Sequence, residues 1–204
     1  MASRVADLFK GGYHVEDPPI AKALFSSTAA AWFWLVVRLY VGYEWLEAGL
    51  HKFADPKWMS DGTALLGYWT NAVKVPDAPA RAAITFDWFR SFLQVLIAND
   101  TSVWMAKVIV FGELAIGVGL IVGAFVGVAA FFGALMNMNF MLAGSASTNP
   151  VLFFLAVGLM LAWKVAGYYG ADRALLPLVG TPWHGYVPEK TVAPTAGTAA
   201  VRIA

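Results

Sequence analysis

Long apolar stretches, separated by short polar or proline-containing breaks, dominate the pattern along the chain. The first covers residues 30–53 and is long enough to cross a bilayer, for which roughly 20 apolar residues suffice. Residues 103–143 are also mostly apolar, and one helix of that length would measure roughly 60 Å, about twice the thickness of the hydrocarbon layer. We therefore place a turn near Gly123 and predict four spans, at about residues 30–53, 103–122, 126–143 and 150–170.

Residues 54–102 differ from the spans because they mix aromatic and charged side chains, and Trp and Tyr favour the headgroup layer of a bilayer. Asp61 predicts the start of a short helix over about 62–74, and Thr85 the start of another over about 86–98. The second helix carries an apolar stripe at helical spacing, formed by Phe86, Phe89, Leu93 and Leu96 or Ile97. We interpret this segment as an amphipathic cap on the membrane, which either seals one end of the bundle or serves as a docking platform or lid.

Together these patterns predict an all-α fold, namely an integral membrane four-helix bundle with the aromatic-rich cap between its first two helices. The transmembrane domain is expected over residues 29–171, with a polar tail over 1–28 and another tail over 172–204. Because proline interrupts helices, we expect Pro18-Pro19 to stop any helix that would enter the membrane from the first tail.

Composition agrees with a membrane protein, since 59% of the 204 residues are hydrophobic and only 13% are charged, against about 25% charged in soluble domains. The formal net charge of +1 and the lack of a basic run give no reason to expect nucleic-acid binding. Absence of cysteine excludes disulfide exchange and cysteine-ligated metal clusters on this chain. Lysine and arginine are more frequent in the two tails than in residues 54–102, which favours a cytoplasmic position for both termini.

The first span carries ionisable residues, which inside a bilayer normally face a bundle interior, a wet cavity or a partner. At about 100° per residue, one side of this helix is acidic and aromatic, with Tyr40, Glu44, Glu47 and His51. The other side holds Arg38, Gly42, Trp45 and Gly49. The two glycines, a heptad apart, are expected to let a neighbouring helix approach closely.

The other spans also carry polar groups near their middles, and two interpretations stay open. The charges either form an internal salt-bridge network that fixes helix packing, or they line a pocket that handles protons or a quinone. In the second case the candidate catalytic residues are Glu113, Glu44, Glu47 and His51. The candidate cofactor-binding residues are Arg38, Lys164 and Asn137, with Arg38 or Lys164 holding the charge opposite to the proton acceptor.

Haem and metal sites usually need several histidine ligands, and the predicted membrane region has too few of them. Only His51 lies there, because His14 and His184 are in the tails, which argues against a haem held between two histidines of this chain. No histidine–carboxylate motif recurs on facing helices, so we expect no metal site. If electrons pass here, we expect a diffusible quinone or a redox group on another subunit.

Three stretches carry a recognisable pattern: RLYVGYEWLEAGLHKFADP (38–56), MNMNFMLAGSASTNP (136–150) and LAWKVAGYYGADRALLPLVGTPW (161–183). The first resembles the first-helix signature of the DoxX/DoxD family, and its matching positions are Arg38, Gly42, Gly49 and Lys52. The second resembles the third helix and following turn of that family, and the third resembles its fourth helix and exit.

This resemblance implies a multi-pass protein of a bacterial or archaeal cytoplasmic membrane, surrounded by lipid and associated with other subunits of a redox complex. Some relatives are described as the large subunit of thiosulfate:quinone oxidoreductase, working with a small DoxA-type subunit. The implied function is therefore a membrane subunit of a quinone-linked redox complex, with thiosulfate oxidation as one possible source of electrons. The alternative is a non-catalytic accessory or assembly subunit of a larger respiratory or photosynthetic complex, with the cap, including Trp58, Trp69 and Trp88, as its contact surface.

Overall fold

The computed structural model describes residues 17–179, and every regular element in that range is a helix. The tail residues 1–16 and 180–204, with His14 and His184, lie outside the described residues. The elements are α2 (Pro19–Phe25), the 3-10 helix η1 (Thr28–Ala30), α3 (Ala31–Ala54), α4 (Pro56–Met59), α5 (Thr63–Ala72), α6 (Asp87–Ala98), α7 (Ser102–Val122), α8 (Val126–Leu142), α9 (Asn149–Leu161), α10 (Trp163–Ala166) and α11 (Asp172–Leu178).

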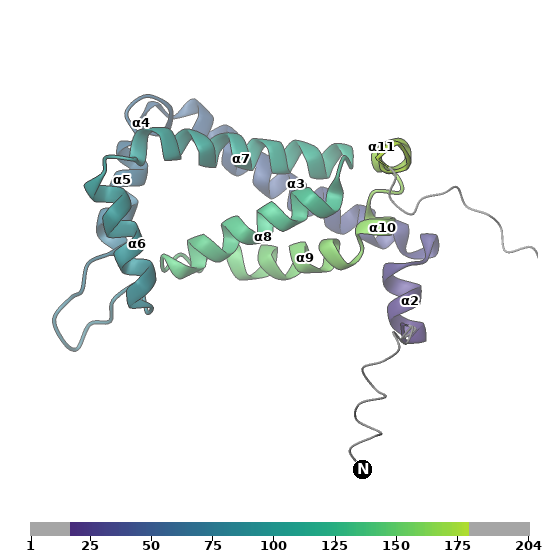
Figure 1. The fold of residues 1–204 in the computed structure, drawn as a ribbon, viewed down its shortest axis with the longest axis horizontal. Helices are drawn as coiled ribbons and strands as arrows, with labels where there is room; N and C mark the ends of the chain where they lie inside the picture. Colours follow the sequence, from purple (N-terminus) through teal and green to yellow (C-terminus); the bar gives the residue numbers. More distant parts are fainter. Residues whose placement is uncertain (1–16, 180–204) are drawn as a thin grey trace, which may run out of the picture.

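The four long helices form two antiparallel pairs, α3 with α7 and α8 with α9 (Figure 1). The pairs meet where the chain turns from α7 into α8. They diverge toward the opposite end, where α5 and α6 stand across the opening between them (Figure 1). We call the region between the two diverging pairs the wedge.

The α3–α7 pair is close because glycines replace side chains at the crossing. A Cβ atom added at Gly42 or Gly49 would lie within 3.0 Å of Ile121 or Leu114, at 2.9 and 2.8 Å respectively. A Cβ atom at Gly117 would lie 2.7 Å from the backbone nitrogen of Leu46. The expected close approach of a neighbouring helix at Gly42 and Gly49 is confirmed, and that neighbour is α7.

The turn from α7 into α8 lies at the predicted place, because Gly123 adopts a left-handed conformation with φ of 73° and ends α7. The carboxylate of Asp172 accepts hydrogen bonds from the backbone N–H groups of Phe125 and Val126 at the start of α8. Asp172 was expected to begin the C-terminal tail, and this expectation is wrong. It is only 2% exposed, and residues 172–178 form α11.

The first described helix, α2, begins at Pro19, because proline is tolerated in the first turn, where its missing N–H has no helical partner. One further helix boundary differs from the prediction. The fourth span, expected over 150–170, breaks after Leu161 and continues as the short α10. α10 ends at Ala166, and the carbonyls of Ala166 and Tyr169 accept hydrogen bonds from the guanidinium of Arg38.

The cap contains its two predicted helices, α5 and α6. Asp61 holds the start of α5, since its Oδ1 accepts from the backbone N–H of Thr63 at 2.9 Å. Thr85 does not cap α6: the capping position is Phe86, and no side chain caps it. The apolar stripe of α6 is buried at its centre, where Phe89 and Leu93 pack into a core of the cap that includes Leu65, Trp69 and Ile84.

By length and composition, α7 alone among the helices of residues 17–179 could cross a bilayer. A second candidate arises if α2 and the η1–α3 segment, bent by 56°, count as one span. The helices α8 and α9 are apolar but shorter. The helix expected as the first span is present as α3, but it does not qualify by itself, because its charged residues lower its mean hydropathy.

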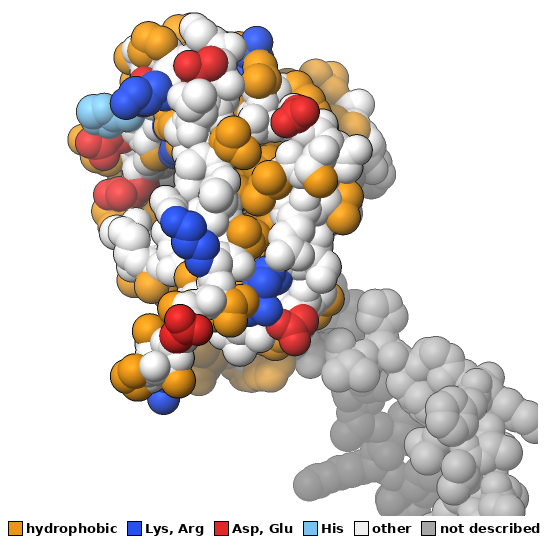
Figure 2. Space-filling view, turned by 90° about the vertical axis from the view of Figure 1, so that its left-hand side faces the viewer, with side chains coloured by type: hydrophobic (Ala, Val, Ile, Leu, Met, Phe, Trp, Pro, Cys, Tyr) orange, Lys and Arg blue, Asp and Glu red, His pale blue; other side chains and the backbone are white. Residues whose placement is uncertain are grey.

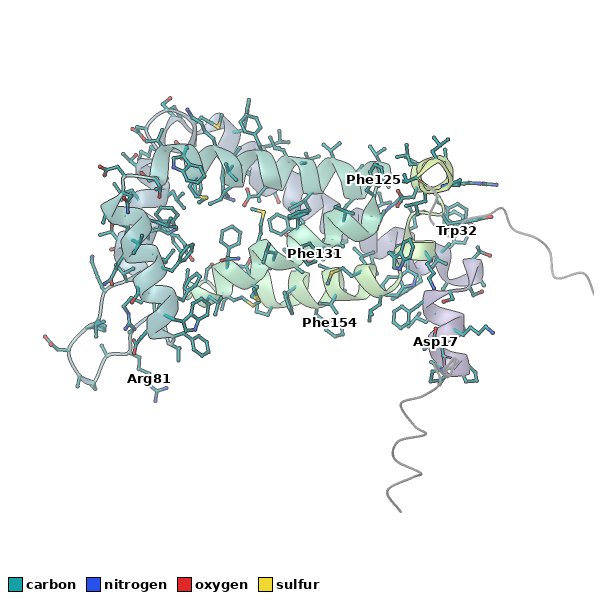
Figure 3. The ribbon with its side chains drawn as sticks, viewed as in Figure 1. Asp17, Trp32, Arg81, Phe125, Phe131 and Phe154 are labelled. Carbon is teal, nitrogen blue, oxygen red and sulfur yellow. The ribbon has the colours of Figure 1, made fainter. Side chains whose placement is uncertain are left out.

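Large apolar side chains remain exposed on the outer faces of all four long helices. Figure 3 shows Phe154 projecting from α9 away from the other helices, and this side chain is 75% exposed. Others are Trp32 and Tyr43 on α3, Phe111 and Val118 on α7, Phe131 and Met138 on α8, and Val151 on α9. At the end of the molecule formed by the cap, acidic, basic and hydrophobic side chains are instead interspersed (Figure 2).

Candidate functional site

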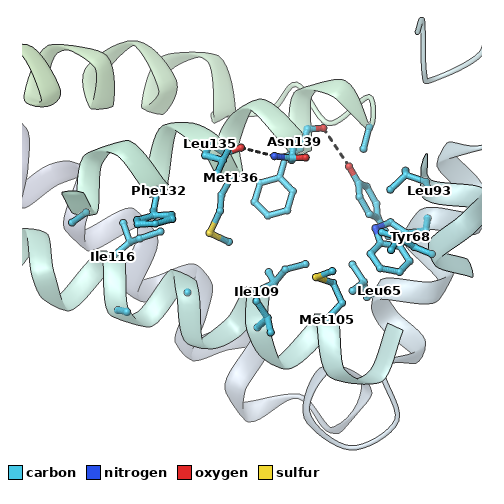
Figure 4. A pocket seen from close by; sticks show the side chains of 18 of the residues that line it. Leu65, Tyr68, Leu93, Met105, Ile109, Ile116, Phe132, Leu135, Met136 and Asn139 are labelled. Atoms are coloured by element: carbon cyan, nitrogen blue, oxygen red, sulfur yellow. Dashed lines mark hydrogen bonds between the residues drawn. The ribbon is translucent and has the colours of Figure 1, made fainter. Parts of the chain in front are cut away.

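The wedge between the helix pairs opens on one flank between α7 and α8 as an apolar cavity of about 590 Å³ (Figure 4). The side chains of Met105 and Ile109 on α7 and of Phe132 and Met136 on α8 line it, and the cap closes its wide end. None of its lining residues is charged. A cavity of this size and character suits an apolar chain or ring.

On the other flank the same wedge opens between α3 and the start of α9 as a polar groove of about 510 Å³. Its lining includes Glu44, Glu47, His51, Lys52, Glu113 and Asn137, together with residues of the turn between α8 and α9. Three carboxylates thus face one ammonium group and one imidazole. We call the two openings the apolar cavity and the polar groove.

Three side chains, Leu65, Tyr68 and Phe140, line both openings and separate them. The hydroxyl of Tyr68 donates a 3.4 Å hydrogen bond to the carbonyl of Phe140 (Figure 4). Burial raises the pKa of the Tyr68 phenol, so this group is a neutral donor at physiological pH. Because they share these lining residues, the cavity and the groove are adjacent.

A buried ion pair forms the inner wall of the polar groove. The ammonium of Lys52 lies 2.7 Å from each carboxylate oxygen of Glu113, and the Glu113 side chain is only 1% exposed. The same ammonium lies 5.3 Å from the centre of the Trp58 ring, within reach of a cation–π interaction. The charge opposite to Glu113 is therefore held by Lys52, and the expected partners Arg38 and Lys164 do not hold it.

Five of the seven predicted site residues lie together in the polar groove: Glu44, Glu47, His51, Glu113 and Asn137. Nε2 of His51 lies 3.8 Å from Oε1 of Glu47, and these two side chains are 79% and 50% exposed. They therefore form a rim that contacts the surroundings, whereas Glu113 and Asn137 lie inside.

Arg38 and Lys164 are not part of this groove. Arg38 is buried at the opposite end of α3, where it donates to the carbonyls of Ala166 and Tyr169 at 3.3 and 3.2 Å. It also interacts electrostatically with Asp172, so it joins α3 to the segment between α10 and α11. Lys164 is exposed on α10.

Three residues that matter here were not among the predicted site residues: Lys52, Trp45 and Tyr68. Lys52 was noted only as a family-signature position, although a lysine in the last turn of a span is a natural partner for a buried acid. Trp45 gave no signal beyond its place on the glycine side of α3. Tyr68 lines both openings only because of the way α5 packs against the long helices, and no local sequence pattern predicts that packing.

Among residues 17–179, no group of three His, Asp or Glu side chains could hold a metal ion. Comparison of the chain with protein-family models, curated proteins and solved structures found no match.

Proposed function

We propose that this chain is a multi-pass protein of a bacterial or archaeal cytoplasmic membrane, with α3, α7, α8 and α9 as spans and both termini in the cytoplasm. The exposed apolar side chains on all four helices support this, since lipid is the solvent that they suit. The segment from α9 through α10 is about 27 Å long at about 1.5 Å per residue, close to the hydrocarbon thickness of roughly 30 Å.

The wedge is proposed to bind a quinone, with its apolar tail in the apolar cavity and its head near the polar groove. One observation carries this proposal: an uncharged cavity that opens sideways between two helices is adjacent to a groove that holds buried polar groups. Sideways access suits a ligand dissolved in lipid, and a site with both characters suits an amphiphile.

On this basis the chain is a DoxX/DoxD-like membrane subunit of a quinone-linked redox complex. The groove has more carboxylates than cations, which disfavours a doubly charged anion such as thiosulfate. We therefore assign oxidation of the donor to a partner, such as a small DoxA-like subunit, which passes two electrons to the quinone. We propose that the exposed pair His51 and Glu47 relays from the surrounding water the two protons that, with the two electrons, convert the quinone into hydroquinone.

Filling the apolar cavity tests this proposal. Gly112 faces the cavity, and the nearest atom to a Cβ added there is the flexible Met136 sulfur at 3.4 Å. We expect Gly112→Phe to lower the quinone that co-purifies in mild detergent by at least about tenfold, which corresponds to about 1.4 kcal/mol of binding free energy. The quantity measured is moles of extracted quinone per mole of protein.

The matched control is Gly67→Phe, because a Cβ at Gly67 on α5 meets no atom within 4 Å and Gly67 lines neither opening. It should retain the quinone content of the unmodified protein. Equal quinone content in both variants, or no quinone in the unmodified protein and no binding of added quinone, would contradict the proposal.

The second candidate function is a non-catalytic accessory subunit, favoured by the outer face of α6. Trp88 and Val95 are exposed there, whereas Trp69 is buried in the cap and Trp58 is half-buried. Under this hypothesis Trp88→Ala should detach the protein from a larger complex during gentle extraction, while Trp69→Ala should act only on stability. Retention of the Trp88→Ala variant in the complex would count against this function.

A further inference from the structure

Two buried side chains in the polar groove have hydrogen-bonding groups without partners among residues 17–179. Neither Oδ1 nor Nδ2 of Asn137 has a partner, although this side chain is 0% exposed. The indole N–H of Trp45, which is 3% exposed, also has none. An unpaired buried polar group costs about 1–3 kcal/mol, so three such atoms in one groove indicate a ligand that pairs with them.

These groups face the same part of the wedge. Nε1 of Trp45 lies 3.2 Å from the position of a Cβ atom on Gly133, which is one turn before Asn137 on α8. Residues four apart on a helix share a face, so the Trp45 N–H lies against the face of α8 that carries Asn137, and both side chains line the polar groove. Both oxygens of Glu113, on the neighbouring helix α7, already accept from Lys52. The unpaired groups of Trp45 and Asn137 are thus two kinds of donor and one acceptor.

We propose that Trp45 and Asn137 bind the head of the quinone and that the site binds the reduced hydroquinone in preference to the oxidised quinone. This inference rests on the proposed function. A quinone carbonyl only accepts hydrogen bonds, so it can pair with the Trp45 N–H and the Asn137 amide N–H but leaves Oδ1 of Asn137 unpaired. A hydroquinone hydroxyl both donates and accepts, so it can satisfy all three atoms.

This preference gives the groove a role in the reaction. A site that binds the product of quinone reduction more tightly than the substrate favours electron uptake by the bound quinone. The surplus of carboxylates in the groove does not oppose this, because hydroquinone is uncharged. Trp45 and Asn137 are then specificity-determining residues, distinct from the proton-supplying rim of His51 and Glu47.

The test measures dissociation constants for decylubiquinol and decylubiquinone under anaerobic conditions, by calorimetry on the full-length protein in detergent. We expect the quinol to bind about tenfold more tightly, the effect of one buried hydrogen bond of about 1.4 kcal/mol. Asn137→Leu should weaken quinol binding about tenfold and remove the preference. Trp45→Phe should weaken both forms by a similar factor and keep the preference, because its N–H can donate to either form.

Two matched controls change the same residue types at exposed positions outside both openings. Asn71→Leu on α5 and Trp32→Phe on α3 should leave both constants unchanged. Asn137→Leu should melt no lower than the unmodified protein, since it removes an unpaired buried amide without changing its volume greatly. A lower melting temperature with unchanged quinol binding would make Asn137 a packing residue and overturn the inference.

A glycerolipid such as monoolein also presents uncharged hydroxyl groups, so it serves as a competitor. Displacement of decylubiquinol by equimolar monoolein would assign the site to lipid and overturn the inference. Equal affinity of the unmodified protein for the two quinone forms would also overturn it, while leaving quinone binding intact. Failure of both forms to bind would instead contradict the proposed function itself.

Discussion

Lys52→Met should lower the free energy of unfolding by about 3 kcal/mol or more, because removal of one partner leaves an uncompensated buried charge. Glu113 is 1% exposed, and Lys52 supplies the ammonium group that contacts both of its oxygens at 2.7 Å. The loss should appear in equilibrium unfolding of the detergent-solubilised protein by a chemical denaturant.

Two comparison variants make this expectation specific. Lys57→Met removes the same charge at an exposed position on α4 and should change stability by less than about 1 kcal/mol. The double variant Lys52→Met/Glu113→Leu should recover most of the loss, since replacing a buried pair by apolar residues is often neutral. If Lys52→Met were as stable as Lys57→Met, or if the double variant were no better than the single one, the ion pair would not support the fold.

Arg38→Met should also lower the free energy of unfolding by about 3 kcal/mol, because Arg38 joins α3 to the segment between α10 and α11. It would leave the carbonyls of Ala166 and Tyr169 without their donor. Burial raises the pKa of Asp172, and the positive charge of Arg38 lowers it. The variant would remove that charge. Asp172 caps α8, so the loss should loosen the contact between the turn after α7 and the end of α10.

The control for Arg38 is Arg173→Met, which lies next to Asp172 but is exposed and contacts the face of Tyr168 at 5.2 Å. Its loss should cost less than about 1 kcal/mol. Hydrogen exchange at the start of α8 should rise in Arg38→Met and stay unchanged in Arg173→Met. Equal exchange in both variants would show that Arg38 does not hold this junction.

The sequence predicted the helices well where local physics decides them. The bounds of α3, α7 and α8 lie within one residue of the predicted spans, because long apolar runs, Gly123 and the break at Asp55-Pro56 act locally. The assignment of α3 to two faces was equally local: Arg38, Gly42, Trp45 and Gly49 are buried, whereas Tyr40, Glu47 and His51 are exposed.

Features that depend on contacts between distant segments were missed. Glu113 pairs with Lys52, 61 residues away, because glycine-mediated packing sets the register between α3 and α7. Similarly, the carbonyls of Ala166 and Tyr169, at the end of the fourth predicted span, accept hydrogen bonds from Arg38, more than 120 residues earlier in the chain. Asp172 looked like a tail residue because nothing near it in the sequence indicates the start of α8 as its partner.

The candidate site shows the same division. Helical periodicity grouped Glu44, Glu47 and His51, and the structure places these three in the polar groove with Glu113 and Asn137. Periodicity placed Arg38 on the other side of the helix, but it could not show that Arg38 pairs with Ala166 and Tyr169 and not with Glu113. The apolar cavity arises from the divergence of the two helix pairs, which no single segment encodes.

The most direct measurement is photolabelling of the protein in native membranes with an azido-quinone, followed by mass spectrometry of the labelled peptides. A quinone between α7 and α8 predicts labels on the facing residues of these helices, within 105–119 and 128–140, and their loss when unlabelled quinone is added in excess or Gly112→Phe is introduced. Labels spread over the outer faces of α3 and α9 that excess quinone does not displace would contradict quinone binding in the wedge.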